Sequence, residues 1–199
     1  ANNFLKPDDI IVALDNQIYT FGEKQFTSDL KELKKSSQKS MLTVLRDDTF
    51  FNLLIENSLG CKFVTTTAEE TSKIKSDYLS QETNDLDELK EFIGMRDVYR
   101  NYEVIENANS LSAGIFPPFW LAYSQKWWIL LLFTAIMAVS VLVNIYFFFL
   151  GWLLTSIYCY KAQLNLLFSF SMLEGKVFCT KILSKSIDEA QKTIRKLDP

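Results

Sequence analysis

The sequence contains no histidine, and its 199 residues include only three cysteines, six glycines and four prolines. Without histidine, the chain has no imidazole for acid–base catalysis near neutral pH and none to bind a metal. The cysteines are Cys61, Cys159 and Cys179, and no Cys-x-x-Cys pair occurs. Because they are odd in number and far apart, we expect a reducing compartment and no disulfide framework.

Charge is missing from a long stretch of the chain. Between Glu106 and Lys161 the only charged residue is Lys126. Residues 1–110 hold 13 basic and 20 acidic side chains, whereas residues 111–199 hold 8 and 4. The mean hydropathy of +0.05 therefore averages two different halves. This pattern indicates an acidic polar domain joined to a membrane segment.

The uncharged stretch from Trp127 to Tyr160 is 34 residues long. One helical span needs about 20 apolar residues, and a helix of that full length would extend about 51 Å across a core of about 30 Å. We therefore predict two spans within residues 126–170, near 127–143 and 146–170, with a tight turn at Asn144. The alternative is one long tilted helix in which Asn144 bonds to a neighbour.

An aromatic segment, "FPPFWLAYSQKWW", precedes the first predicted span. Trp and Tyr rings concentrate at membrane–water interfaces, and a lysine there extends its amine to the headgroups. Pro117 and Pro118 interrupt any continuous helix, so we predict a separate interfacial element over residues 112–125. The predicted interface belt consists of Trp120, Tyr123, Lys126, Trp127 and Trp128.

Lysines predict the orientation of the spans. They lie before the first span and near or after the second, and the turn at Asn144 has none. Lys and Arg are enriched in cytoplasmic segments, so we expect both termini in the cytoplasm. The lysines used here are Lys126, Lys161, Lys176, Lys181 and Lys185.

The polar N-terminal part reads as alternating strands and helices. Residues 10–21 predict two strands around an Asp15-Asn16 turn, and Asp47-Asp48 marks the turn of a second hairpin. Between them, Ser28 is the expected cap of a helix whose apolar stripe includes Leu30. This gives a first domain over residues 1–64.

Two further polar segments flank the membrane part. Residues 65–111 are expected to form a helical linker region, with a helix that starts at a Thr67–Glu70 capping box, a helix from Asn84 to Gly94, and a strand at "NYEVIE". In residues 171–199 we expect a strand followed by a helix capped at Ser186. That tail is too small to fold alone, so it should pack on the cytoplasmic domain or on a partner.

The segments "PDDIIVALDNQIY", "TSDLKELKK" and "LTVLRDD" resemble the later part of a bacterial PDZ domain, over about residues 4–56. In such domains a peptide carboxylate binds a Gly-Φ-Gly-Φ loop, whose place would precede residue 4. We therefore expect docking through a surface or sheet edge instead of capture of a free C-terminus. The residues that carry the resemblance are Asp9, Ile10, Ile11, Leu14, Asp15, Asn16, Asp29, Leu30, Val44, Leu45 and Arg46.

Residues 107–197 resemble a bacterial inner-membrane family of unknown function, found in alphaproteobacteria. The likeness rests on its FPPxWLxYxKxW pattern at Phe116–Trp127 and on shorter matches at Ala162, Leu166, Leu173-Glu174-Gly175 and Glu189-Ala190. The resemblance implies a membrane hairpin in the bacterial inner membrane. It implies no reaction, because the family has none assigned.

The sequence offers no convincing catalytic or cofactor site. It has no P-loop and no GxGxxG. The pairs Asp8-Asp9, Asp47-Asp48 and Glu69-Glu70 fit solvated turns and helix starts better than metal sites, and Cys61 fits a structural thiol better than a reactive one. We expect no enzyme activity, no cofactor or metal, and no nucleic-acid or small-molecule partner.

The predicted fold class is α+β: a small PDZ-like cytoplasmic domain, a transmembrane hairpin and a short strand–helix tail. The leading hypothesis is a non-catalytic accessory or assembly subunit of an inner-membrane complex, of which a respiratory or photosynthetic complex would be an example. Its partners would be larger membrane subunits and lipid. The alternative is a free-standing membrane-anchored adaptor that recruits peptides or soluble proteins.

Overall fold

The computed structural model describes residues 5–36, 39–55, 59, 62–81 and 84–198, and the fold is mixed α+β, as predicted. The chain divides into two compact units. The first, here called the sheet domain, comprises residues 1–96, 100–106 and 178–199. The second, the helical unit, comprises residues 97–99 and 107–177. The helical unit is thus inserted in the sequence of the sheet domain.

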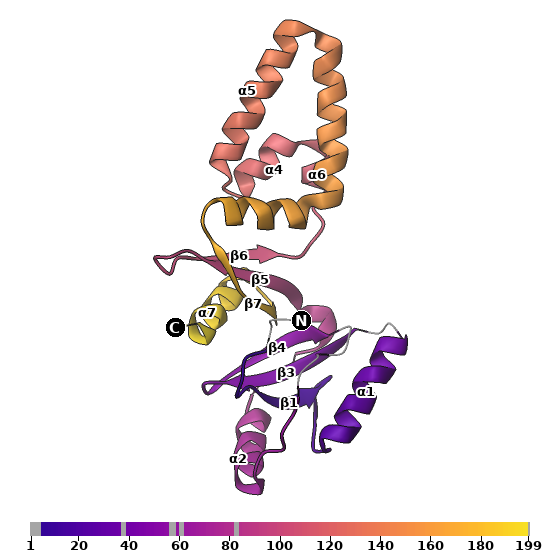
Figure 1. Cartoon of the computed structure of the whole chain (residues 1–199), viewed down its shortest axis with the longest axis vertical. Helices are drawn as coiled ribbons and strands as arrows, with labels where there is room; N and C mark the ends of the chain where they lie inside the picture. Colours follow the sequence, from indigo (N-terminus) through magenta and orange to yellow (C-terminus); the bar gives the residue numbers. More distant parts are fainter. Residues whose placement is uncertain (1–4, 37–38, 56–58, 60–61, 82–83, 199) are drawn as a thin grey trace. The chain divides into compact units, whose positions relative to one another are not determined.

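In the part of the chain that the structure describes, the sheet domain has seven strands in the order β2-β1-β3-β4-β7-β5-β6 (Figure 1). The β3–β4 and β5–β6 pairs are antiparallel hairpins with continuous register. By contrast, within the described residues β4 and β7 are paired at Asn52 with Leu183 alone. The strands are β1 (Ile10–Leu14), β2 (Gln17–Ile18), β3 (Ser40–Arg46), β4 (Thr49–Ile55), β5 (Lys90–Arg96), β6 (Tyr102–Glu106) and β7 (Val177–Ser184).

Two short turns set the register of the first strands, and both predictions are confirmed. Asp15 and Asn16 join β1 to β2 with φ of +46° and +64°, and Asp47 and Asp48 join β3 to β4 with φ of +45° and +61°. Two-residue hairpin turns with both residues at positive φ match the right-handed twist of the strands, and Asp and Asn tolerate that conformation.

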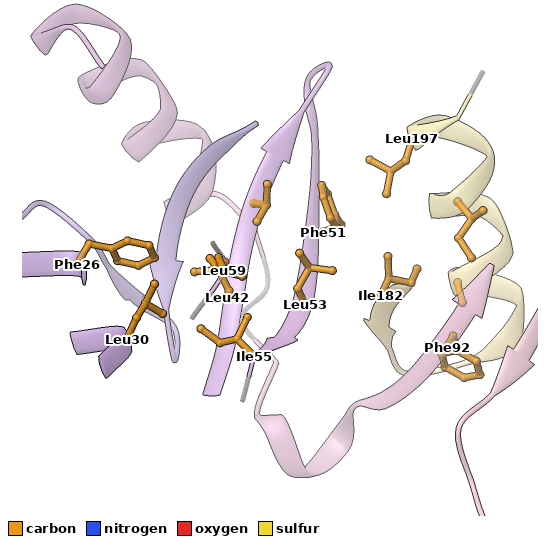
Figure 2. Close-up of a cluster of buried hydrophobic side chains, with 13 residues drawn as sticks. Phe26, Leu30, Leu42, Phe51, Leu53, Ile55, Leu59, Phe92, Ile182 and Leu197 are labelled. Atoms are coloured by element: carbon orange, nitrogen blue, oxygen red, sulfur yellow. The ribbon is translucent and has the colours of Figure 1, made fainter. Parts of the chain in front are cut away.

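Helices α1 (Glu23–Ser36) and α7 (Ile187–Leu197) cover one face of the sheet. Along β4, Phe51, Leu53 and Ile55 point to this face, in the two-residue period of a strand. Figure 2 shows the resulting core between the helices and the strands. Its buried members are Phe26, Leu30, Leu42, Val44, Phe51, Leu53, Ile55, Leu59, Phe92, Ile182, Ala190, Ile194 and Leu197.

Helix α2 (Ala68–Leu79) packs on the other face. Its Tyr78 is buried against Val12 and Ala13 of β1, with Phe50 of β4 nearby at a ring-centroid distance of 5.9 Å. The predicted capping box at its start is confirmed, because the Thr67 hydroxyl accepts from the Glu70 amide and the Glu70 carboxylate accepts from the Thr67 amide.

The tail predicted as a strand and a helix is present as β7 and α7. Strand β7 lies between β4 and β5, and α7 contributes Ala190, Ile194 and Leu197 to the main core. The tail therefore completes the sheet domain, which agrees with the expectation that it cannot stand alone. Ser186 caps α7 by accepting from the Glu189 amide, as predicted.

Two helix predictions in this domain were wrong. Helix α1 begins at Glu23, so Ser28 lies inside it and does not cap it. The helix expected from Asn84 to Gly94 is instead a single 3-10 turn, η1 (Leu86–Glu88), followed by β5. Phe92, Ile93 and Met95 are all buried. A strand covered on both faces has a continuous apolar run, which periodicity cannot distinguish from a helix.

Gly94 was expected to end that helix, but it has a packing role in β5. A Cβ at this position would lie 2.8 Å from Cδ1 and 3.0 Å from Cγ2 of Ile194. The absent side chain thus allows α7 to approach the sheet closely. A larger residue would force the Ile194 side chain, or α7 with it, to shift.

We expect Gly94→Ala to lower the free energy of unfolding of the sheet domain by about 1–3 kcal/mol, the range for overpacked cores. Ile194→Val removes the Cδ1 atom that is closest, so the double variant should recover part of the loss. Denaturant unfolding of the full chain, followed by hydrogen exchange of α7 and β5 peptides, measures both. A double variant as unstable as the sum of the two single variants would show that the contact with Ile194 is not the cause.

Candidate functional site: the helical unit

Two long apolar helices make up most of the helical unit. Helices α5 (Trp127–Val143) and α6 (Ile145–Leu173) meet at Asn144, whose φ of −167° and ψ of 131° are extended. The turn predicted at Asn144 is confirmed, and the alternative of one continuous helix through Asn144 is wrong. Figure 1 shows the two helices side by side, joined at their tip.

Asn144 caps both helices. Its amide donates to the Ser140 carbonyl at the end of α5. Its side-chain Oδ1 accepts from the Tyr146 amide, and its carbonyl accepts from the amides of Phe147 and Phe148. The first amides of a helix have no partner within the helix, so one residue satisfies three donors at the start of α6. This explains how so short a turn reverses the chain.

Helix α6 is bent at Ala162, where φ is −115° and ψ is 15°. The part after the bend runs across the base of the unit in Figure 1. The second span predicted over residues 146–170 is therefore not one straight helix. Gln163, buried next to the bend, accepts from the Ser110 amide at 2.9 Å and donates to Asn109 Oδ1 at 3.1 Å. These bonds fix the entering chain to the bend.

The element predicted over residues 112–125 consists of two short helices, α3 (Leu111–Ile115) and α4 (Pro117–Tyr123). Pro117 begins α4, at the position where a missing N–H costs nothing. Both helices pack at the base of the unit against the start of α5 and against α6 on both sides of its bend. The buried members of this base core are Ala113, Trp120, Leu121 and Cys159, and Ile129, Leu130, Phe133, Leu166, Leu167 and Phe170 pack around them.

The two long helices also touch along their length. The ring of Trp152 lies 6.1 Å from that of Phe133 across the pair, and a Cβ on Gly151 would be 3.8 Å from Cε of Met137. Their remaining surface is largely exposed and apolar. Large exposed side chains on it include Leu131, Leu132, Ile136, Val139, Leu142, Val143, Phe147, Phe149, Leu150, Leu153, Leu154 and Ile157.

The two long helices differ in their exposure from the core helices of a soluble domain, which are mostly buried. Monomeric soluble proteins seldom expose apolar patches above a few hundred Å². Among the described residues, one helix, α6, is long and apolar enough by length and composition to cross a membrane. The apolar helix α5 is shorter, at 17 residues.

The predicted belt residues fall into two groups. Tyr123, Trp127 and Trp128 are exposed, at 87%, 63% and 77% of their full area. Trp120 and Lys126 are buried, at 3% and 2%. Trp120 is therefore a core residue of the base, and Lys126 cannot extend to lipid headgroups as expected. Side chains a few positions apart on a helix point in different directions, and composition alone does not reveal which of them are buried.

Lys126 is the buried member of a polar network at the base of the unit. Its Nζ donates to Ser171 Oγ and to Glu174 Oε2, both at 2.9 Å, and Lys176 Nζ lies 2.8 Å from the same carboxylate oxygen. Partial burial would raise the pKa of Glu174, but the hydrogen bonds and charges of Lys176 and Lys126 outweigh it and lower the pKa. The network joins the start of α5 to the end of α6.

Sequence reasoning missed Ser171, Glu174 and Gln163. The signal for the first two was the single lysine in an uncharged stretch, since a buried ammonium needs a carboxylate or hydroxyl partner. Glu174 is the next acidic residue after Glu106. Gln163 offered a similar signal, as an amide within an apolar run.

The residues of the PDZ-like pattern have structural roles in the sheet domain. The Arg46 guanidinium binds the Asp9 carboxylate through Nε and Nη2, both at 2.6 Å, and lies over the ring of Phe51. Asp15 Oδ1 accepts from the Met41 amide, and Asn16 donates to the Asn84 carbonyl. The others pack in the core or hold α1: Leu30 is buried, Ile10, Ile11 and Leu14 pack against the clusters, and Asp29 accepts from the Tyr19 hydroxyl.

The sheet domain contains a polar cavity of about 320 Å³. Its walls carry amide, hydroxyl and carboxylate groups, including Asn52, Asn84, Ser184 and Glu189. Within the described part of the chain, no group of three or more His, Cys, Asp and Glu side chains could hold a metal ion. Cys61 lies outside the described residues.

Comparison of the chain with protein-family models, with curated proteins and with solved structures found no match. The two resemblances drawn from the sequence therefore remain proposals.

Proposed function

We propose that the protein is a non-catalytic accessory subunit of a bacterial inner-membrane complex, anchored by the helical unit as a two-span hairpin. The observation that carries this proposal is the exposed apolar surface on both long helices. Such a surface is stable against lipid tails or against apolar helices of a larger membrane subunit. In water it would promote aggregation.

The connectivity of the sheet domain supports a hairpin instead of a single span. The chain leaves this domain after β6 and returns as β7, which lies between β4 and β5. Segments on both sides of the helical unit thus belong to one folded sheet. They must lie on the same side of a membrane, and the enrichment of lysines around the spans favours the cytoplasmic side.

The net acidic charge of the sheet domain favours a basic partner. Over the whole sheet domain, 22 acidic side chains outnumber 18 basic ones, and cytoplasmic loops of membrane proteins are rich in Lys and Arg. Opposite charges steer association and fix the register of an interface. We propose that the sheet domain docks on such loops, and that the PDZ-like part serves as a platform.

A second candidate is an adaptor that recruits a peptide or soluble protein to the membrane. The polar cavity of the sheet domain favours it, because its volume of about 320 Å³ falls within the size of ligand pockets. Its lining is polar, so the ligand would offer hydrogen-bond donors and acceptors.

The test compares two substitutions of exposed aliphatic residues in the full-length protein. Ile136→Arg changes the middle of α5, whereas Val64→Arg changes the sheet domain; Val64 is 90% exposed. Arginine at the centre of a membrane helix costs about 2.5–3.5 kcal/mol. We expect Ile136→Arg alone to release the protein from alkali-washed membranes, and the parent to co-migrate with a large complex on native gels.

Equal retention of both variants would contradict the membrane anchor. Full retention of the parent, but migration as a small species in mild detergent, would replace the accessory subunit with the adaptor.

A further inference from the structure

The two halves of the hairpin, residues 127–144 and 144–161, are here called its arms, and they have equal length. Asn144 lies 17 residues after Trp127 and 17 residues before Lys161, and the straight part of α6 ends at Ala162. At 1.5 Å per residue each arm extends about 25 Å. A typical hydrocarbon core is about 30 Å thick, so the arms are short by about 5 Å.

Both arms begin at groups that prefer the membrane interface. Trp127 and Trp128 are exposed at the start of α5, and Tyr160 and Lys161 are exposed at the corresponding level of α6. Aromatic rings and lysines at these positions hold a helix at a fixed depth. The arms therefore cannot slide freely to bring their tip deeper.

The tip favours polar surroundings. A helix end leaves its last carbonyls without intrahelical partners, and hydrocarbon offers none. Asn144 accepts hydrogen bonds from amides at the start of α6. At the end of α5 its own amide donates to one carbonyl, that of Ser140. Tyr146, which is 79% exposed, adds a hydroxyl that suits the headgroup region.

We propose that the hairpin fits a bilayer with a hydrocarbon core of about 25 Å, with Asn144 and Tyr146 at the headgroups of the far leaflet. The partner of its exposed apolar surface is then a thin bilayer, or one thinned locally around the arms. This inference rests on the proposed membrane anchor. Beyond the anchor itself, it specifies how deep the tip of the hairpin lies and that the hairpin prefers a thin bilayer.

The experiment uses the full-length chain with Tyr146→Cys, which leaves the Asn144 cap intact. The protein is reconstituted into phosphatidylcholine vesicles with short (myristoyl) or long (erucoyl) chains. A membrane-impermeant maleimide is then added either outside or within the vesicle lumen. Ile136→Cys, in the middle of α5, is the matched control, and the parent chain measures labelling of the native cysteines.

In short-chain vesicles we expect Cys labelling at position 146 only from the side opposite the sheet domain, and at least a several-fold decrease in long-chain vesicles. Position 136 should stay unlabelled in both. Equal labelling of position 146 in both lipids would overturn the thickness preference, and no labelling in the short-chain lipid would show a tip that never reaches the far surface. A protein that does not bind either vesicle would refute the membrane anchor itself.

Discussion

Asp9→Ala should lower the free energy of unfolding of the sheet domain by about 3–5 kcal/mol, the cost of removing one partner from a buried ion pair. The Asp9 and Arg46 side chains are only 3% and 5% exposed, and their two hydrogen bonds are 2.6 Å long. Without the carboxylate, the guanidinium stays buried between β1 and β3 with no opposite charge in this pair. The pair also anchors the start of β1, because Asp9 Oδ2 accepts from the Lys6 amide.

Two further variants separate the ion pair from general damage. In the double variant Asp9→Leu with Arg46→Met, both charges are gone, and we expect most of the stability to return, as apolar pairs of similar size replace buried ion pairs well. Glu106→Ala breaks the exposed pair with Lys90 and should cost less than about 1 kcal/mol. Denaturant titration of the full chain in mild detergent, read by hydrogen exchange of β3 and β4 peptides, gives all three values. A double variant no more stable than Asp9→Ala would count against a buried charge as the cause.

Features that depend on neighbouring residues were predictable from the sequence. The turns at Asp15-Asn16 and Asp47-Asp48 were predictable because Asp and Asn tolerate positive φ. The capping box was predictable from the spacing of Thr67 and Glu70. The break at Asn144 followed from a polar residue within an apolar run. In each of these, the residues that decide the structure lie within a few positions of one another.

Features that depend on distant residues were not predictable in the same way. Strand β5 was read as a helix because the residues that bury its two faces come from elsewhere in the chain. The glycine at position 94 is explained by its contact with Ile194, 100 residues later. Lys126 was assigned to headgroups because its partners, Ser171 and Glu174, follow 45 and 48 residues later. An aromatic belt is visible in composition, but which of its rings face inward is a property of packing.

Trp120 gives the clearest test of this last point. Trp120→Ala should destabilise the helical unit by about 3–5 kcal/mol, the usual cost of deleting a buried Trp side chain. Its ring is 3% exposed and packs with Ala113, Leu121 and Cys159 in the base core. The loss should appear as faster hydrogen exchange in α4 and in the part of α6 after Ala162.

Trp128→Ala is the matched control, because the same ring is removed from a side chain that is 77% exposed. It should change the stability of the unit in detergent by less than about 0.5 kcal/mol. In a bilayer we expect the order of effects to reverse. In the proposed membrane anchor Trp128, together with Trp127, contacts the interface, so its loss should weaken binding to vesicles while the unit stays folded. Should Trp128→Ala unfold the unit while Trp120→Ala leaves its exchange unchanged, the base core described for the helical unit would be wrong. If both variants stay folded and bind vesicles equally, the Trp128 ring has no anchoring role, and the depth of the hairpin must depend on other exposed groups at this level, such as Trp127, Tyr160 and Lys161.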